Sequence, residues 1–221
     1  MPSISSPVFL DSNVYLGYAM NTYLETFHNE CCLIFDGLPN DRHTSDTVKR
    51  EIKKKVRKRK EIYSEFLEFC NKRSDPSAFD LSKYNDNDAS HMMKLILMVK
   101  TIDPNTLQYI RRLGTILEVG VQDGLSKTKP PFIPVSENDE LKILLSEGTG
   151  IHIEDARIIV DYLDWGLKIA GSHFISSDNE IHDKRVEVLR FLEGNFTQQT
   201  NKFSFLHLRD VAGFFTPQPN H

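Results

Sequence analysis

The sequence predicts an α/β domain with a mainly parallel sheet flanked by helices. Short apolar runs at 8–11 and 173–176 are typical of buried strands, and they alternate with longer stretches whose apolar residues recur at helical spacing. Each of these strands leads into an aspartate, Asp11 or Asp178. A chain of 221 residues is long enough for one such domain with a large insertion.

The N-terminal part is expected to contain a tail, a strand and a helix. Residues 1–7 hold two prolines and three serines, which predicts a flexible tail. The first strand is followed by a helix through 14–30, which Ser12 or Asn13 would cap. Residues 31–35 fit a short strand or the end of that helix.

A long helix and a helical insertion follow. An apolar stripe predicts one helix over 45–73. The insertion, at about 76–130, contains helical patterns at 91–102 and 105–125 and no recognisable chemical motif. Three prolines in 126–136 predict a loop.

The C-terminal part returns to the α/β pattern. It is predicted to contain helices at 137–148 and 152–170, a strand at 173–176, a helix at 183–192, a last strand at 202–211 and a flexible tail at 212–221. The whole indicates one domain over 8–211 that includes the insertion.

Composition excludes several classes of protein. The formal net charge is −4, so a nucleic-acid binder of this composition needs a local basic patch. Three cysteines without a CxxC motif favour a reducing compartment and no structural zinc. The sequence shows no signal-peptide pattern and no apolar run long enough for a membrane helix, so we expect a cytoplasmic protein without membrane contact.

Four carboxylates are expected to meet at one edge of the sheet. Ligands of parallel sheets bind beyond the carboxyl ends of the strands, where Asp11 and Asp178 fall. Glu51 lies on the long helix beside its apolar stripe, and Asp155 lies in the first turn of the helix before the second strand. Carboxylates gathered in one crevice repel each other, and a hard divalent cation such as Mg²⁺ or Mn²⁺ removes that penalty.

The order of these motifs resembles that of the PIN-domain nucleases. The matching segments are VFLDSN, SDTVKREI, HIEDARIIVDYL and HFISSDNEI, within about 8–60 and 137–211. The resemblance implies a PIN-like fold with four catalytic, metal-binding acids and a fifth metal ligand; these are Asp11, Glu51, Asp155, Asp178 and Glu180.

The resemblance also implies an activity. This is divalent-metal-dependent hydrolysis of RNA, in which one Mg²⁺ or Mn²⁺ activates water and a second, about 3.5–4 Å away, steadies the leaving oxygen. Ser12, Asn13 and Ser176 would support the acids or contact the scissile phosphate. The resemblance leaves open a homodimer and a partner that is an antitoxin or an RNA-processing protein.

A basic run at 53–60 carries seven positive charges in eight positions. One interpretation is an RNA-backbone contact through Lys53, Lys54, Arg57 and Lys58. The other is a solvated helix face. Two further acids on the same predicted helix as Asp155, namely Asp161 and Asp164, are expected to be surface charges.

Two alternatives compete with a nuclease. A phosphatase of the haloacid-dehalogenase kind also begins with a strand-end aspartate, but it needs a second acid two positions later, where this chain has Asn13. A PIN-like module that binds RNA or protein without cutting has the same acids and stays open.

Overall fold

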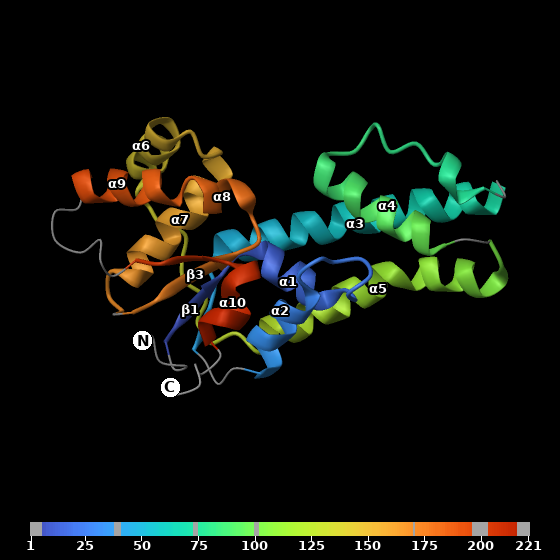
Figure 1. Ribbon diagram of the computed structural model, residues 1–221, viewed down its shortest axis with the longest axis horizontal. Coiled ribbons are helices and arrows are strands. Elements are labelled where there is room, and N and C mark those ends of the chain that lie inside the picture. Colours follow the sequence, from blue (N-terminus) through green and yellow to red (C-terminus); the bar gives the residue numbers. More distant parts are fainter. Residues whose placement is uncertain are drawn as a thin grey trace.

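The computed structural model describes residues 6–37, 41–72, 75–99, 102–169, 171–195 and 203–215. Within these residues a four-stranded parallel sheet is flanked by helices, so the predicted α/β class with a mainly parallel sheet is confirmed (Figure 1). The strand order is β2–β1–β3–β4, with β1 at Val8–Leu10, β2 at Arg42–His43, β3 at His173–Ser176 and β4 at Phe205–His207. The strand β2 was not predicted from the sequence.

The register of the sheet brings the carboxyl ends of β1 and β3 together. Val8 lies opposite His173, and Leu10 lies opposite Ile175. The backbone N–H of Asp11 donates to the carbonyl of Ile175 (3.1 Å), which continues the pairing one residue past β1. Residues that follow these strands therefore share one edge of the sheet.

An aromatic cluster packs the helix α7 (Ile153–Gly166) against the sheet. The ring of Tyr162 lies 5.6 Å from that of Phe9, 5.4 Å from that of Phe174 and 5.7 Å from that of Phe205, measured between centroids. Such pairs bury large apolar area in fixed geometries. The N-terminus of α7, with Asp155, is thereby fixed relative to β1 and β3.

A second packing contact joins α1 (Ser12–Ala19) to α5 (Pro104–Ser126). The two backbones approach closely at Gly120, where an added Cβ would lie 2.6 Å from Cα of Ala19. Only a glycine fits at such a crossing.

A helical arm extends away from the sheet, and it includes only the part of the predicted insertion at about 76–130 that precedes residue 116 (Figure 1). The arm, defined here as residues 59–72, 75–99 and 102–115, comprises the outer part of α3 (Asp46–Lys72), η2 (Pro76–Ala78), α4 (Asp86–Met98) and the first half of α5. Helix α3 is continuous from the sheet to the end of the arm. Within the described ranges, no helix is at once long and apolar enough to cross a lipid bilayer.

The helix predicted at 14–30 is interrupted in the structure. Helix α1 ends at Ala19, and α2 (His28–Cys32) starts after a turn. The side chain of Asn21 accepts hydrogen bonds from the backbone N–H groups of Tyr23 (3.1 Å) and Leu24 (3.2 Å), which stabilises that turn. Residues 31–35, expected as a short strand or as the end of that helix, are helical, because α2 continues into the π-helix η1 (Leu33–Gly37).

The last strand is shorter than predicted. After β4 the chain becomes α10 (Leu208–Phe215), and the Nδ1 atom of His207 accepts the backbone N–H of Arg209 (3.1 Å) at its start. Helix α10 also occupies part of the predicted tail at 212–221. The rest of that tail and most of the predicted tail at 1–7 lie outside the described residues. The remaining helices are α6 (Asp139–Thr149), α8 (Asn179–Asp183) and α9 (Arg185–Asn195).

Candidate active site at the carboxyl edge of the sheet

Asp11 is buried and held by hydrogen bonds at both carboxylate oxygens. It follows β1, is 3% exposed and caps α1, with Oδ1 accepting the backbone N–H of Ser12 (2.6 Å). Its Oδ2 accepts from Oγ of Ser176 (2.7 Å) and Nδ2 of Asn13 (3.3 Å). The predicted cap by Ser12 or Asn13 is wrong, because Asp11 itself takes that position.

Asp178 is fixed in the same way at the end of β3. It caps α8, and its Oδ1 accepts the backbone N–H groups of Glu180 (2.7 Å) and Ile181 (3.4 Å). Its own backbone N–H donates to Oγ of Ser176 (2.9 Å). The hydroxyl of Ser176 therefore links the two strand-end aspartates.

Asp155 lies in the first turn of α7, as predicted, and is half-buried. Burial, followed by the negative charges of Asp11, Asp178 and Glu51, raises the pKa of Asp155 to about 7. Burial and then the charge of Glu51 also raise the pKa of Asp11. The four predicted acids thus share one electrostatic environment, and we call Asp11, Glu51, Asp155 and Asp178 the acid cluster.

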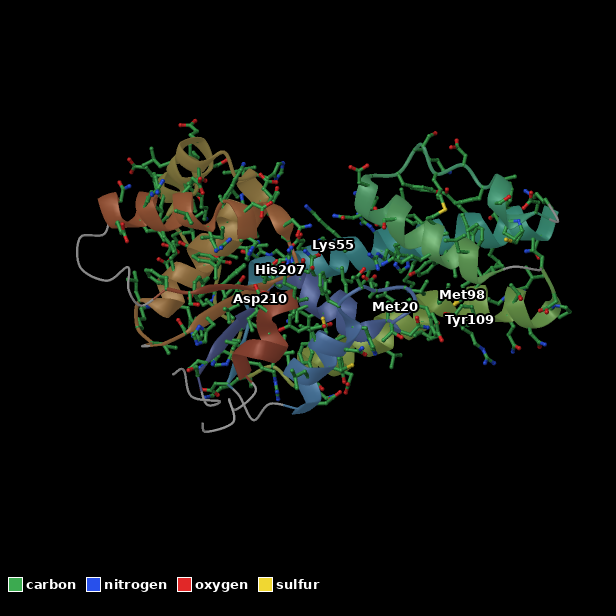
Figure 2. The ribbon with its side chains drawn as sticks, in the orientation of Figure 1. Met20, Lys55, Met98, Tyr109, His207 and Asp210 are labelled. Atoms are coloured by element: carbon green, nitrogen blue, oxygen red, sulfur yellow. The ribbon has the colours of Figure 1, made fainter. Side chains whose placement is uncertain are left out.

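A lysine lies among these acids. The ammonium of Lys55 is 2.9 Å from Oε1 of Glu51, and it donates to Oγ of Ser12 and Oδ1 of Asn13, each at 2.9 Å. Figure 2 places Lys55 near the centre of the molecule, on α3 between the sheet and the arm. Sequence reasoning missed this residue, although its four-residue spacing from Glu51 predicts a side-chain pair on one helix face.

The donor chemistry of the acid cluster fits a hard divalent cation. All four residues offer carboxylate oxygens, the ligands that Mg²⁺ and Mn²⁺ prefer, and Oε2 of Glu51 is buried without a hydrogen-bond partner. Among the described residues no group of three or more His, Cys, Asp or Glu side chains is arranged to hold a metal ion.

A cavity of about 460 Å³ lies between the arm and one side of the acid cluster, where Asp178 lines it. It is lined on the cluster side by residues that include Asn13, Lys55 and Asp178, by Lys58 farther along α3, and on the arm side by residues that include Asn87 and Lys94. A ligand in this cavity would contact the sheet edge and the arm together.

The basic run divides between this cavity and solvent. Lys58 lines the cavity and pairs with Oδ2 of Asp88 (2.5 Å). Lys53, Lys54 and Arg57 are exposed on α3 outside the cavity lining.

Three further acids considered in the sequence have other surroundings. The carboxylate of Glu180 is exposed and pairs with Nζ of Lys184 (3.1 Å). Asp161 was expected at the surface, which is wrong: it is fully buried, and its Oδ1 accepts the backbone N–H of Ser136 (2.8 Å). Asp161 thereby anchors the proline-containing loop. Asp164, also expected at the surface, is half-exposed.

No protein-family model, curated protein or solved structure matches the chain. The fold and the site define the chain as an α/β protein with an acid cluster at the carboxyl edge of a parallel sheet.

Proposed function

We propose that the chain is a PIN-like, divalent-metal-dependent ribonuclease that hydrolyses RNA phosphodiester bonds at the acid cluster. The observation that carries this proposal is the shared electrostatic environment of four carboxylates from four separate elements. They meet where ligands of parallel sheets bind. Repulsion among them costs stability, and perturbed carboxyl pKa values of this kind cluster at functional sites.

Mg²⁺ or Mn²⁺ bound at the cluster would activate the attacking water and stabilise the leaving oxygen. The main ligands would be Asp11 and Asp178, whose carboxylates are already oriented by Ser176 and by the first N–H groups of α8. With its Oδ1 engaged in the helix cap, Asp178 offers Oδ2. Asp155 and Glu51 would complete the donor set or orient the water, and Asn13 would orient Asp11.

The cavity between the cluster and the arm supports a strand-shaped substrate. An RNA strand with one phosphate at the cluster would extend into this polar cavity, which Lys58 and Lys94 help to line. These cations would neutralise backbone phosphates, so we expect binding that weakens with salt. The three cysteines are free thiols, which fits the cytoplasmic location that belongs to this proposal.

A second candidate is a PIN-like module that binds RNA or a protein without cutting. The position of Lys55 favours it, because a lysine that already neutralises the acids reduces their need for a metal ion. The two candidates differ in whether bound RNA is hydrolysed.

Cleavage of end-labelled single-stranded RNA in Mn²⁺ tests the proposal. We expect the wild-type protein to cut and EDTA to abolish cutting. Asp11→Asn should cut at least about 100-fold more slowly, because loss of one ligand removes several kcal/mol of transition-state stabilisation. Asp164→Asn, which removes a carboxylate from α7 outside the cluster, should cut at the wild-type rate.

Two results would overturn the proposal of a ribonuclease. Equal cutting by wild type and Asp11→Asn would assign the activity to a contaminant. Salt-dependent RNA binding without cutting by any of the three proteins would establish the binding module instead.

A further inference from the structure

The ammonium of Lys55 has a complete set of partners. Each of its three N–H groups has an oxygen at 2.9 Å, from Ser12, Asn13 and Glu51. Two of these oxygens come from the start of α1, directly beside Asp11, and the third comes from α3. This arrangement is a built cation site, whereas a surface lysine usually has a mobile, solvated head group.

The charges around Lys55 come from the acid cluster. Burial lowers the pKa of Lys55, but the carboxylates of Asp11, Glu51 and Asp155 outweigh burial and raise it. Other residues of the basic run do not take this position, since Lys53 and Lys54 are exposed. A positive charge at this point is therefore stabilised by at least three acids.

We propose that Lys55 is the resident counter-ion of the acid cluster and competes with a divalent cation for the negative charge of the same carboxylates. The competition rests on the proposed metal-dependent function, whereas the counter-ion role stands by itself. A divalent cation among these carboxylates would lie close to the ammonium, which already pairs with Oε1 of Glu51, and two positive charges so placed repel each other. A cation therefore binds the cluster more weakly while the ammonium stays in place.

The side chain of Lys55 has room to move. It is 34% exposed and lines the cavity, and its four-carbon stem is flexible. Displaced into the cavity, the ammonium would stay within the path proposed for the RNA backbone. Until a divalent cation binds, the ammonium of Lys55 would thus neutralise the acid cluster.

Calorimetric titration with Mn²⁺ alone, without RNA, measures the competition. Lys55→Met keeps an unbranched side chain and removes the charge, so we expect its Kd for Mn²⁺ to be at least about 10-fold lower than that of wild type. Lys72→Met removes the same charge from the exposed far end of α3 and should leave the Kd unchanged. An unchanged or higher Kd for Lys55→Met would overturn the competition.

Thermal unfolding in EDTA measures the counter-ion role without any metal. We expect Lys55→Met to unfold about 5 °C below Lys72→Met, because the acids lose their partner. Equal unfolding temperatures would overturn the counter-ion role. If Lys55→Met is less stable and none of the three proteins binds Mn²⁺, the counter-ion role stands while the competition and the metal-dependent ribonuclease fall.

Discussion

At the scale of residues, the acid cluster is held together by short polar side chains. Ser176 donates to Asp11 and accepts from the backbone of Asp178, and Asn13 contacts both Asp11 and Lys55. These bonds orient the carboxylates without cancelling their mutual repulsion. Within the cluster, the raised pKa of Asp155 is the clearest sign of that cost.

Replacing Asp155 by asparagine should stabilise the metal-free protein at high pH. Its folded pKa of about 7 lies above the usual 3.8, so folding disfavours the charged form, and the cost grows as pH rises between these values. In urea denaturation with EDTA, we expect Asp155→Asn to be about 2 kcal/mol more stable than wild type at pH 8. This expected gain is smaller than the full conversion of the pKa shift at ~1.36 kcal/mol per pK unit, because the side chain of Asp155 is only half-buried and solvent screens its charge.

At pH 4 the gain should vanish, because the folded wild-type carboxyl is then protonated. Asp164→Asn should show no comparable difference between the two pH values. A wild-type protein that is as stable as Asp155→Asn at pH 8 would contradict the raised pKa.

The sequence predicted the positions of Asp11 and Asp178 because parallel strands end at one edge of their sheet. Lys55 was missed because the rotation of α3 about its axis decides which basic residues meet the acids. Asp161 looked like a surface charge because its partner, the backbone of Ser136, is 25 residues away in the chain. Burial of that kind depends on tertiary contacts that no local pattern records.

At the scale of elements, the crossing of α1 and α5 depends on one of two glycines that look alike in the sequence. At Gly120 an added Cβ would meet the backbone of Ala19, whereas at Gly114 it would meet only the side chain of Lys60, at 3.0 Å. Backbone cannot move aside as a lysine side chain can.

Gly120→Ala should therefore lower the free energy of unfolding by about 1–3 kcal/mol, as overpacking does. Gly114→Ala should leave it unchanged or raise it by up to about 1 kcal/mol, through the better helix propensity of alanine. Urea denaturation of both variants checks the contrast. Equal effects at the two positions would contradict the close crossing.

The long helices were predicted well because their apolar stripes repeat over many turns. The sequence failed where one residue redirects the chain. Asn21 stabilises a turn inside an apparently continuous helix, and His207 accepts a hydrogen bond where β4 becomes α10. Apolar residues continue through both places, so the periodicity alone gave no stop signal.

At the scale of the whole molecule, a buried polar network joins the domain to the arm. Oε1 of Glu25, in the turn after α1, accepts from Nη1 of Arg59 and from Nδ1 of His91 (3.0 Å). Nε2 of His91 lies 2.6 Å from the hydroxyl of Tyr63. Burial lowers the pKa of His91, so the neutral ring donates from Nδ1 and accepts at Nε2.

Glu25→Gln should weaken this connection in a pH-dependent way. Burial raises the pKa of Glu25, but the hydrogen bond from His91 and the charge of Arg59 outweigh burial and lower it to about 2. The stabilisation is thus complete above the usual 4.5 and is lost as pH falls towards 2. We expect the free energy of unfolding of wild type to exceed that of Glu25→Gln by about 2 kcal/mol at pH 7. The difference should become progressively smaller below pH ~4.5.

Chemical denaturation across this pH range measures the difference. Glu118→Gln on α5, which removes an exposed ion pair with Lys60 of α3, should lower the free energy of unfolding by no more than about 0.5 kcal/mol at any pH. A difference between wild type and Glu25→Gln that does not depend on pH would contradict the lowered pKa.

The continuity of α3 has a mechanical consequence. Its 27 residues span about 40 Å and carry Glu51 and Lys55 near one end and the tip of the arm at the other. A helix of this length behaves as a stiff rod, so a load that tilts the tip also turns the end that bears these two side chains. A tilt of the arm would thus displace Glu51 and Lys55 relative to Asp11.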